Sequence, residues 1–481
     1  MPHMRASMAF GCYPLAVVRP GDSRRPSRSN AADYRILASL IGCHETLSLT
    51  GLAARAGVSR RSMTTTASQL APRRILEKAT ARFGPGAGLV LAAGVGTENI
   101  RAALVDANGV LHCEQEAPPD RAQLSESPEY LLRRLRKLTL SVLGQGLASE
   151  SLAGTPGKIP LLGAAVAWPG PIQRDGYARG AAFSDPEWQT VPLVQRLSAA
   201  LGGPFADRSL VDSINGANAA VASIAFDRAS LDESRRRRHS EIVMAVRIGG
   251  IVGAGTIRIP RWSPDGQHPF LRSQLLVGTN GHAGELGHFP IGESAVKLIN
   301  AHSPPRLAPL TSRECSCGRR GHLEGLIGAV GLARRLAQSG YPVDVTRALG
   351  PQLDPLLQNP DETVGRALHD LGRLLGQALA SPILMLDPAN ITLTGYFARP
   401  EIIAGIRGEQ ALLSSGFSTS VEIDQLTADQ NSFVEVRGAA LLRFRRLIYR
   451  DFGALTDQAR WEQLLTIVDR KELEAMHSNE I

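Results

Sequence analysis

Apolar residues recur at helical spacing near the start of the chain. The first such group comprises Ile36, Leu37, Leu40 and Ile41. Apolar residues repeat at the same spacing over 49–56, and Ser59 can cap a third helix that runs to Leu70. The pattern therefore predicts three short helices between residues 31 and 70.

A helix-turn-helix is predicted around Gly57, where the second and third helices meet. Ala53, Gly57 and Met63 supply the small, turn and apolar residues that this motif needs. Residues 73–78 are typical of the start of a small β-wing. The polar side chains that open the third helix would meet base edges and phosphates, and they are Arg60, Arg61, Ser62, Thr64 and Thr65. Residues 31–83 are therefore expected to form a winged helix-turn-helix that binds DNA, with a bundle lacking DNA affinity as the alternative.

Strand-length apolar runs alternate with helical stretches beyond Gly84–Gly86, which has the composition of a linker. The runs that we expect to form strands are 89–93, 100–105, 161–168, 242–248, 384–386 and 391–393. Strands that alternate with helices are typical of an α/β domain, which we place at residues 88–450. Residues 1–30 are rich in Arg, Pro and Ser, so a disordered basic arm is expected there. Residues 451–481 are expected to be a C-terminal tail.

The positive charge of the chain lies in the segment 1–83. This segment carries 13 Lys and Arg against 4 Asp and Glu, a net +9, whereas the whole chain carries +8 and the remainder therefore −1. This asymmetry indicates a polyanionic partner, most often nucleic acid, for the N-terminal segment. A solvated basic tail is the alternative.

Neither a membrane span nor a secretory leader is expected. No apolar run approaches the roughly 18 to 20 residues that cross a bilayer, and Pro14 and Arg19 interrupt the weakly apolar opening. Five cysteines, two of them in Cys315-Ser-Cys317, suit a reducing compartment and a metal site better than disulfides. A cytoplasmic protein is therefore predicted.

Four motifs follow one another in the second and third quarters of the chain. They are Trp168-Pro-Gly-Pro171, Asn215-Gly-Ala-Asn-Ala-Ala220, Gly284-Glu-Leu-Gly-His288 and Cys315-Ser-Cys-Gly-Arg-Arg-Gly-His-Leu-Glu324. In this order they resemble the motifs of the ROK family, which comprises repressors, open reading frames and kinases. The resemblance covers residues 88 to about 445. It implies a two-lobed, actin-like sugar-kinase fold of the ribonuclease H-like ATPase class, with a cleft between the lobes and a final helix, at 439–449, packed on the first lobe.

The resemblance also implies a sugar site. The family's sugar contacts fall on Asn215, Glu285, His288 and Glu324. Amide, carboxylate and imidazole groups suit a hexose, because sugar hydroxyls both donate and accept hydrogen bonds. A set of polar residues with only structural roles is the alternative.

Kinase chemistry is not expected. In similar kinases an Asp follows the Asn and removes the proton from the attacking sugar hydroxyl, but Gly216 stands there. The phosphate turn of those kinases has the pattern Asp-x-Gly-x-Thr-Lys, whereas this chain has Gly94-Val-Gly-Thr-Glu-Asn99 and lacks the acid that would help to hold Mg²⁺. The protein is therefore predicted not to be an enzyme.

A structural zinc site is predicted from His288, Cys315, Cys317 and His322. Two thiolates and two imidazoles are a soft set that suits tetrahedral zinc, and the family usually offers three cysteines and one histidine. Because the spacing between His288 and Cys315 is wider than the family usually shows, an inserted loop around 302–309 is expected to bulge out. Two free cysteines near unrelated histidines are the alternative.

Together these features predict a transcriptional regulator, by resemblance a repressor, that responds to a sugar or sugar phosphate. It would bind double-stranded operator DNA as a homodimer or homotetramer. One alternative is an active hexose kinase with an accessory DNA-binding head, which needs another acid to replace the one missing beside Asn215. A scaffold that binds DNA or protein without any sugar is the other.

Overall fold

The computed structural model describes most of the chain between residues 31 and 478. The described residues are 31–41, 47–96, 99–118, 128–152, 157–173, 175–179, 190–231, 239–262, 268–311, 314–347, 349–413, 421–448 and 455–478. The basic arm predicted at 1–30 lies outside them. Among the described helices, none is both long and apolar enough to span a membrane.

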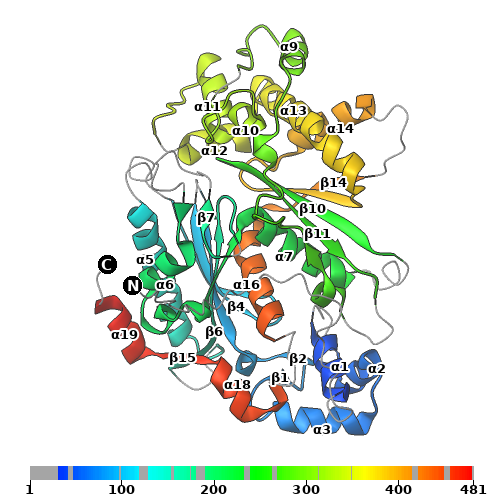
Figure 1. Ribbon diagram of the computed structural model, residues 1–481, viewed down its shortest axis with the longest axis vertical. Helices are drawn as coiled ribbons and strands as arrows, with labels where there is room; N and C mark the ends of the chain where they lie inside the picture. The colour runs from blue at the N-terminus through cyan, green and yellow to red at the C-terminus, as the bar shows by residue number, and fades with distance from the viewer. Residues whose placement is uncertain are drawn as a thin grey trace, which may run out of the picture.

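A six-stranded sheet forms the core of the first lobe (Figure 1). Its strands are β3 (Leu89–Val95), β4 (Ile100–Asp106), β5 (Leu111–Ala117), β6 (Lys158–Trp168), β9 (Val211–Asn215) and β15 (Thr466–Asp469). Along the sheet the order is β15-β6-β3-β4-β5, and β9 also pairs with β6. β3 runs antiparallel to β4 and parallel to β6, which in turn runs parallel to β9.

A five-stranded sheet forms the core of the second lobe. Its strands are β10 (Glu241–Ile248), β11 (Val252–Ile259), β12 (Gln274–Leu275), β13 (Asn390–Thr394) and β14 (Glu422–Gln425). The order is β12-β11-β10-β13-β14, with β10 antiparallel to β11 and parallel to β13. The strands predicted at 242–248 and 391–393 are therefore confirmed, as are those predicted in the first lobe.

Two helices, α7 (Gly216–Leu231) and α16 (Val434–Leu447), lie between the two sheets (Figure 1). Alternate residues of a strand point to opposite faces, so that Val90 and Ala92 of β3 share one hydrophobic cluster with these helices and with Val243 of β10. The intervening residues of both strands belong to the outer clusters of the two lobes. The predicted two-lobed α/β architecture is thus confirmed. α16 covers most of the helix predicted at 439–449 and packs on the first sheet as expected, but it is not the final helix, because two more described helices follow it in the chain.

Further helices cover the outer faces of the sheets. In the first lobe they are α5 (Pro128–Ala148) and α6 (Leu193–Leu201), and the short strands β7 (Ala178–Arg179) and β8 (Thr190–Val191) pair beside them. In the second lobe they are α9 (Glu293–Ala301), α10 (Leu323–Ile327), α11 (Ala329–Gln338), α12 (Gly350–Gln358), α13 (Glu362–Leu386) and α14 (Pro400–Leu413). A short helix, α15 (Ala428–Ser432), precedes α16.

Residues 384–386, predicted as a strand, form the last turn of α13 instead. Leu384 and Met385 are 63% and 81% exposed, so this apolar run does not enter a sheet. Asp387, with φ of 46°, ends the helix. The prediction was wrong because such a short apolar run cannot distinguish a strand from a helix end.

Three helices and a two-stranded hairpin form a small N-terminal head. They are α1 (Ala31–Leu40), α2 (Leu49–Ala56), α3 (Arg60–Leu70), β1 (Leu76–Glu77) and β2 (Arg82–Phe83). Ser48 and Ser59 accept hydrogen bonds from backbone amides and so cap α2 and α3. Gly57 ends α2 in the left-handed conformation, with φ of 62°. The three predicted helices and the predicted glycine turn are therefore present.

Residues 84–86 do not form a free linker. Gly86 N donates to Arg74 O at 3.0 Å, and Gly86 O accepts a hydrogen bond from Trp461 Nε1 at 3.0 Å. A Cβ on Gly86 would lie 1.9 Å from Arg73 O, so glycine is needed here for close packing rather than for flexibility. The hydrophobic cluster of the head continues into that of α7 and α16. The linker predicted at Gly84–Gly86 is therefore wrong, and the head packs directly on the first lobe.

The segment predicted as a tail at 451–481 completes the first lobe from residue 455 onward. β15 pairs antiparallel with β6 and becomes an edge strand of the sheet. It is flanked by α18 (Gln458–Leu464) and α19 (Arg470–Ser478). Arg136 of α5 donates to Met476 O, and the Met476 side chain is buried. The predicted tail is thus wrong, because these residues bury apolar surface and pair their backbone with the sheet.

Candidate functional site

Two cysteines and two histidines converge in the second lobe. One ligand-capable atom from each of His288, Cys315, Cys317 and His322 lies within 4.8 Å of all the others. Cys315 Sγ lies 3.2 Å from His288 Nδ1, and Cys317 Sγ lies 3.2 Å from His322 Nδ1. The structure therefore brings together all four residues that the sequence predicted as a metal site.

Two features of the backbone hold this cluster. Gly318 N donates to Cys315 O at 2.9 Å, and Gly318 takes φ of 80°, a conformation that favours glycine and turns the chain back on itself. Pro290 and His322 form an isolated β-bridge. This bridge places the segment of His288 beside the start of α10.

The segment that separates His288 from Cys315 is, where the structure describes it, a folded insertion rather than a bulging loop. Leu307, in the part predicted to bulge out, is buried in the hydrophobic cluster of the second lobe. Asn300 Nδ2 donates to Leu310 O at 3.0 Å, and Asn300 Oδ1 accepts from Leu310 N at 2.7 Å. The insertion therefore closes on itself and leaves its two ends close together.

The donor set fits a soft divalent metal. Thiolate sulfur and imidazole nitrogen are the usual ligands of structural zinc. Burial is the main cause that raises the pKa of the Cys315 thiol, so the thiolate needs a nearby cation to persist at neutral pH. With two sulfurs and two nitrogens within reach of one point, the described residues supply a complete tetrahedral set.

A half-buried carboxylate borders the cluster at His288. Glu285 Oε2 lies 3.7 Å from His288 Nε2, so the two nitrogens of this imidazole face different partners. Burial raises the pKa of Glu285 to about 7, the charge of His288 opposes this rise, and Glu324 adds to it. Near neutral pH the Glu285 carboxyl can therefore act as donor or acceptor.

Glu324, in the first turn of α10, is tied to the cysteine loop. Its Oε1 accepts a hydrogen bond from Ser316 Oγ at 2.7 Å and lies 3.4 Å from Cys315 Sγ. Its Oε2 accepts from Val252 N at 3.4 Å. Three of the four predicted sugar ligands, Glu285, His288 and Glu324, thus share one neighbourhood beside the metal cluster.

Asn215, the fourth predicted sugar ligand, bonds to the backbone. Its Oδ1 accepts from Ala217 N at 2.9 Å and from Asn218 N at 3.2 Å, and so caps α7. Its Nδ2 donates to Gly170 O at 2.9 Å. Asn215 therefore joins the turn at 168–171 to the start of α7 and keeps one amide hydrogen for a ligand.

An ion pair that the sequence reasoning missed links the two lobes. Arg247 Nε, on β10, donates to Glu435 Oε1, in the first turn of α16, and the two side chains are 14% and 12% exposed. A Cβ built on Gly216 would lie 3.4 Å from Glu435 Oε2, so a carboxylate stands beside the position where the kinase base is missing. The two residues lie 188 positions apart and belong to none of the motifs, so no local pattern could have found them.

The predicted DNA-binding residues lie on the outer surface of the head. Arg60, Arg61, Thr64 and Thr65 are exposed, and Ser62 is half-buried. They occupy α3, which lies at the end of the molecule away from the second lobe (Figure 1). Nothing in the described structure covers them, so this face of α3 is accessible to a partner.

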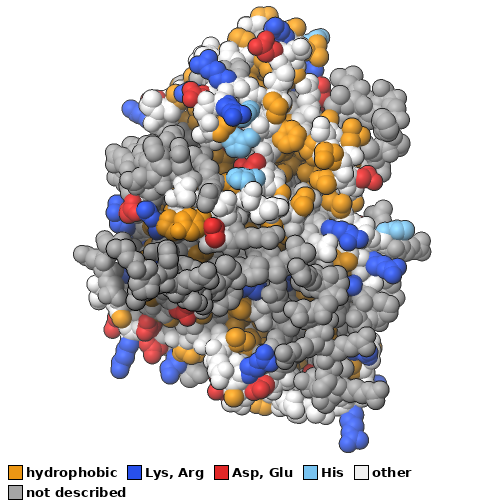
Figure 2. Space-filling view, viewed as in Figure 1, with side chains coloured by type: hydrophobic (Ala, Val, Ile, Leu, Met, Phe, Trp, Pro, Cys, Tyr) orange, Lys and Arg blue, Asp and Glu red, His pale blue; other side chains and the backbone are white. Residues whose placement is uncertain are grey.

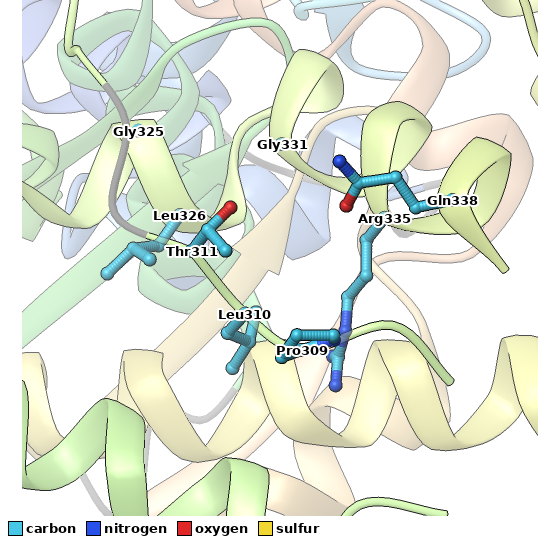
Figure 3. A pocket seen from close by; sticks show the side chains of 8 residues that line it. All are labelled: Pro309, Leu310, Thr311, Gly325, Leu326, Gly331, Arg335 and Gln338. Atoms are coloured by element: carbon cyan, nitrogen blue, oxygen red, sulfur yellow. The ribbon is translucent and has the colours of Figure 1, made fainter. Parts of the chain in front are cut away.

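Histidine and acidic side chains gather near α10 on one face of the second lobe (Figure 2). A cavity of about 10 Å³, the room of one water, is lined in part by Gly325 and Leu326 of α10 (Figure 3). Its wall includes Arg335, which donates to Asp370 Oδ2 at 2.9 Å and to Ala308 O at 2.8 Å. At this volume the cavity is too small for a sugar.

A model of the ROK family matches residues 90–445 of this sequence. The chain belongs to the ROK family. Among curated proteins, none matches it significantly.

Two solved ROK structures resemble the chain in fold. A ROK family glucokinase from Streptomyces griseus, in complex with glucose and AMPPNP, has a TM-score of 0.52 and 17% identity, and the match covers 74% of this chain and 99% of that one. A ROK family transcriptional regulator, a homologue of the E. coli MLC protein, has a TM-score of 0.51 and 17% identity, and the match covers 90% of this chain and 99% of that one. At this identity both show the fold, which ROK kinases and ROK regulators share.

Proposed function

We propose that this ROK protein is a DNA-binding transcriptional regulator, by family resemblance a repressor, that responds to a sugar held between its two lobes. The observation that carries the proposal is the surface of α3. Exposed arginine and threonine side chains open this helix, and the segment 1–83 that contains it has a net charge of +9. Basic and hydroxyl groups on an accessible helix suit phosphate and base contacts.

The arrangement of the head supports a winged helix-turn-helix. α2 and α3 are joined through the left-handed Gly57, and the hairpin β1–β2 follows α3 where a wing would lie. A ROK regulator matches this chain over 90% of its length, whereas the match to the glucokinase covers 74%. Operator half-sites would then be bound by a homodimer or homotetramer.

The four-residue cluster would hold zinc through Cys315, Cys317, His288 and His322. A closed site of this kind stabilises the fold and supplies no reaction. Its place beside Glu285 and Glu324 lets the metal fix the orientation of His288, whose Nε2 faces away from the sulfur. Bound zinc would therefore hold His288 in the orientation that the sugar site needs.

An active sugar kinase is the second candidate, and Glu435 is the observation that favours it. Its carboxylate lies beside Gly216 and could replace the missing base. Against this, Glu435 is already paired with Arg247, and a paired carboxylate is a weak proton acceptor. The acid of the phosphate turn is also replaced, by Gly94. The regulator therefore remains the better proposal.

Two assays test these candidates. DNase footprinting on the DNA upstream of the protein's own gene, with and without hexoses, should show a protected site whose occupancy changes with one sugar. A coupled ADP-release assay with glucose, N-acetylglucosamine and mannose should show no turnover. Sustained turnover that Glu435→Gln abolishes would establish the kinase instead, and the absence of any DNA binding would refute the regulator.

A further inference from the structure

Arg247 fills a space that is enclosed by glycines of both lobes. Three glycines surround its side chain, namely Gly96, Gly249 and Gly395. A Cβ built on them would lie 3.1, 3.4 and 3.2 Å, respectively, from an atom of the Arg247 side chain. Gly96 belongs to the turn that aligns with the phosphate turn of the kinases, so the guanidinium group lies where a phosphate would otherwise approach.

The same glycines have no free amide to offer a phosphate. Each N–H already donates within the chain, and the acceptors are Asn99 O at 2.9 Å for Gly96, Ile251 O at 3.1 Å for Gly249 and Asn431 Oδ1 at 2.8 Å for Gly395. Glycine-rich turns bind phosphate through unpaired amides that point at the anion. At these three positions that cradle is closed.

Glu435 places a negative charge at the same point. A Cβ built on Gly94 would lie 3.7 Å, and one built on Gly216 3.4 Å, from Glu435 Oε2. These two glycines stand where the kinases have the metal-side acid and the base. Since Arg247 is already paired with Glu435 and both side chains are largely closed to solvent, a phosphate group there would meet the Glu435 carboxylate and a guanidinium group that is not free to bind it.

From this geometry we infer that the Arg247–Glu435 pair occupies the phosphate position between the lobes, so that the site accepts an unphosphorylated, neutral sugar and rejects sugar phosphates and nucleotides. The inference rests on the proposed function and narrows its ligand class. Glu435 is then a specificity-determining residue. While its carboxylate is present, the Arg247 guanidinium is paired and cannot bind an anionic ligand. When the carboxylate is removed, Arg247 becomes an anion-binding group.

The test is calorimetric titration of the full-length protein with pyrophosphate, AMPPNP, and glucose, N-acetylglucosamine and mannose beside their 6-phosphates. Wild-type protein should show no detectable binding of pyrophosphate or AMPPNP at millimolar concentration, and any hexose it binds should bind at least tenfold more tightly than its 6-phosphate. Glu435→Ala and Glu435→Gln should each gain pyrophosphate binding by tenfold or more. Arg247→Ala combined with Glu435→Ala should lose that gain.

Glu116→Ala is the matched control, because it removes the carboxylate of the surface pair Arg101–Glu116 and should leave pyrophosphate binding unchanged. The inference is overturned if wild-type protein binds pyrophosphate or prefers a hexose 6-phosphate, or if neither folded Glu435 variant gains an anion. Unfolding curves show which variants are folded. If no hexose binds, the sugar response of the proposed function fails, while the pyrophosphate titrations still decide the role of the pair.

Discussion

Asn108 bonds both main-chain polar groups of Phe83. Its Oδ1 accepts from Phe83 N at 3.1 Å, and its Nδ2 donates to Phe83 O at 2.8 Å. Phe83 ends the hairpin of the head, whereas Asn108 lies in the turn after β4 of the first lobe. In the same turn Gly109 O accepts from Arg437 Nε at 2.8 Å, and Arg437 follows Glu435 closely on α16. α16 therefore carries Glu435 of the inter-lobe ion pair and, through Arg437, also contacts the turn that holds the head.

Asn108→Ala should weaken the sugar response and leave DNA affinity unchanged. The substitution removes two hydrogen bonds of about 1 kcal/mol each between the head and the lobe, while the surface of α3 stays intact. Gel shifts with and without sugar measure the ratio of DNA affinities. Gln115→Ala is the control, because it removes a half-buried side chain of β5 that, among the described residues, bonds only to the backbone of its neighbour Glu114. A ratio unchanged by Asn108→Ala would show that this turn does not transmit the signal.

Replacing both Arg60 and Arg61 with alanine should abolish or greatly weaken operator binding without affecting the fold. Both side chains are exposed on α3, and removing each arginine–phosphate interaction should make the slope of log affinity against log salt shallower by about 0.9. Gel shifts at several salt concentrations provide the measurement. Arg347→Ala removes an exposed arginine from the second lobe and should change neither affinity nor slope. Wild-type affinity in the double variant would exclude α3 as the recognition helix.

Purified protein should carry about one zinc per chain, and Cys315→Ser should reduce this to near zero, because a closed site retains its metal through all four ligands. Elemental analysis gives the metal content. Cys113→Ser is the control, since Cys113 is a free cysteine on β5, outside the four-residue cluster. If Cys315→Ser protein retained its full zinc, Cys315 would not be a ligand.

Glu285→Ala and Glu324→Ala should separate the sugar site from the zinc site. Each should reduce sugar affinity about a hundredfold, because a charge-assisted hydrogen bond to a sugar hydroxyl contributes about 1.5–3 kcal/mol. Only Glu324→Ala should also lower zinc retention, since Glu324 accepts from Ser316 within the cysteine loop. Calorimetry and elemental analysis measure the two effects.

Glu293→Ala, at an exposed position on α9, serves as the control for both carboxylate variants and should bind sugar and zinc as wild type does. A normal sugar response in both Glu285→Ala and Glu324→Ala would place the sensory site elsewhere. The scaffold alternative would then become the better account of the lobes.

The sequence predicted well what neighbouring residues determine. The cap at Ser59 and the turn at Gly57 act within a few residues, so helical spacing and residue type were enough to place α2 and α3, whereas the cap at Ser48 was not predicted. The metal cluster could also be predicted from the sequence, because Cys315, Cys317 and His322 lie within one short segment and only His288 comes from a distant part of the chain.

Contacts between distant segments were not accessible from the sequence. Nothing in the residues around Arg247 or Glu435 indicates a partner 188 positions away. For the same reason Gly84–Gly86 resembled a linker, although its glycines allow close backbone packing. A glycine in the sequence can serve either backbone flexibility or close packing, and only the folded structure shows which of the two applies.

The position of β15 has a consequence for synthesis on the ribosome. The strand begins at Thr466 and pairs with β6, which is already complete at Trp168, much earlier in the chain. Until the segment 455–469 has emerged, the nascent first lobe has an unpaired strand edge, and the head lacks its contact with Trp461. An unpaired edge invites association with other chains. A protein shortened before β15 should therefore accumulate as aggregates, because its first lobe keeps this edge of β6 unpaired.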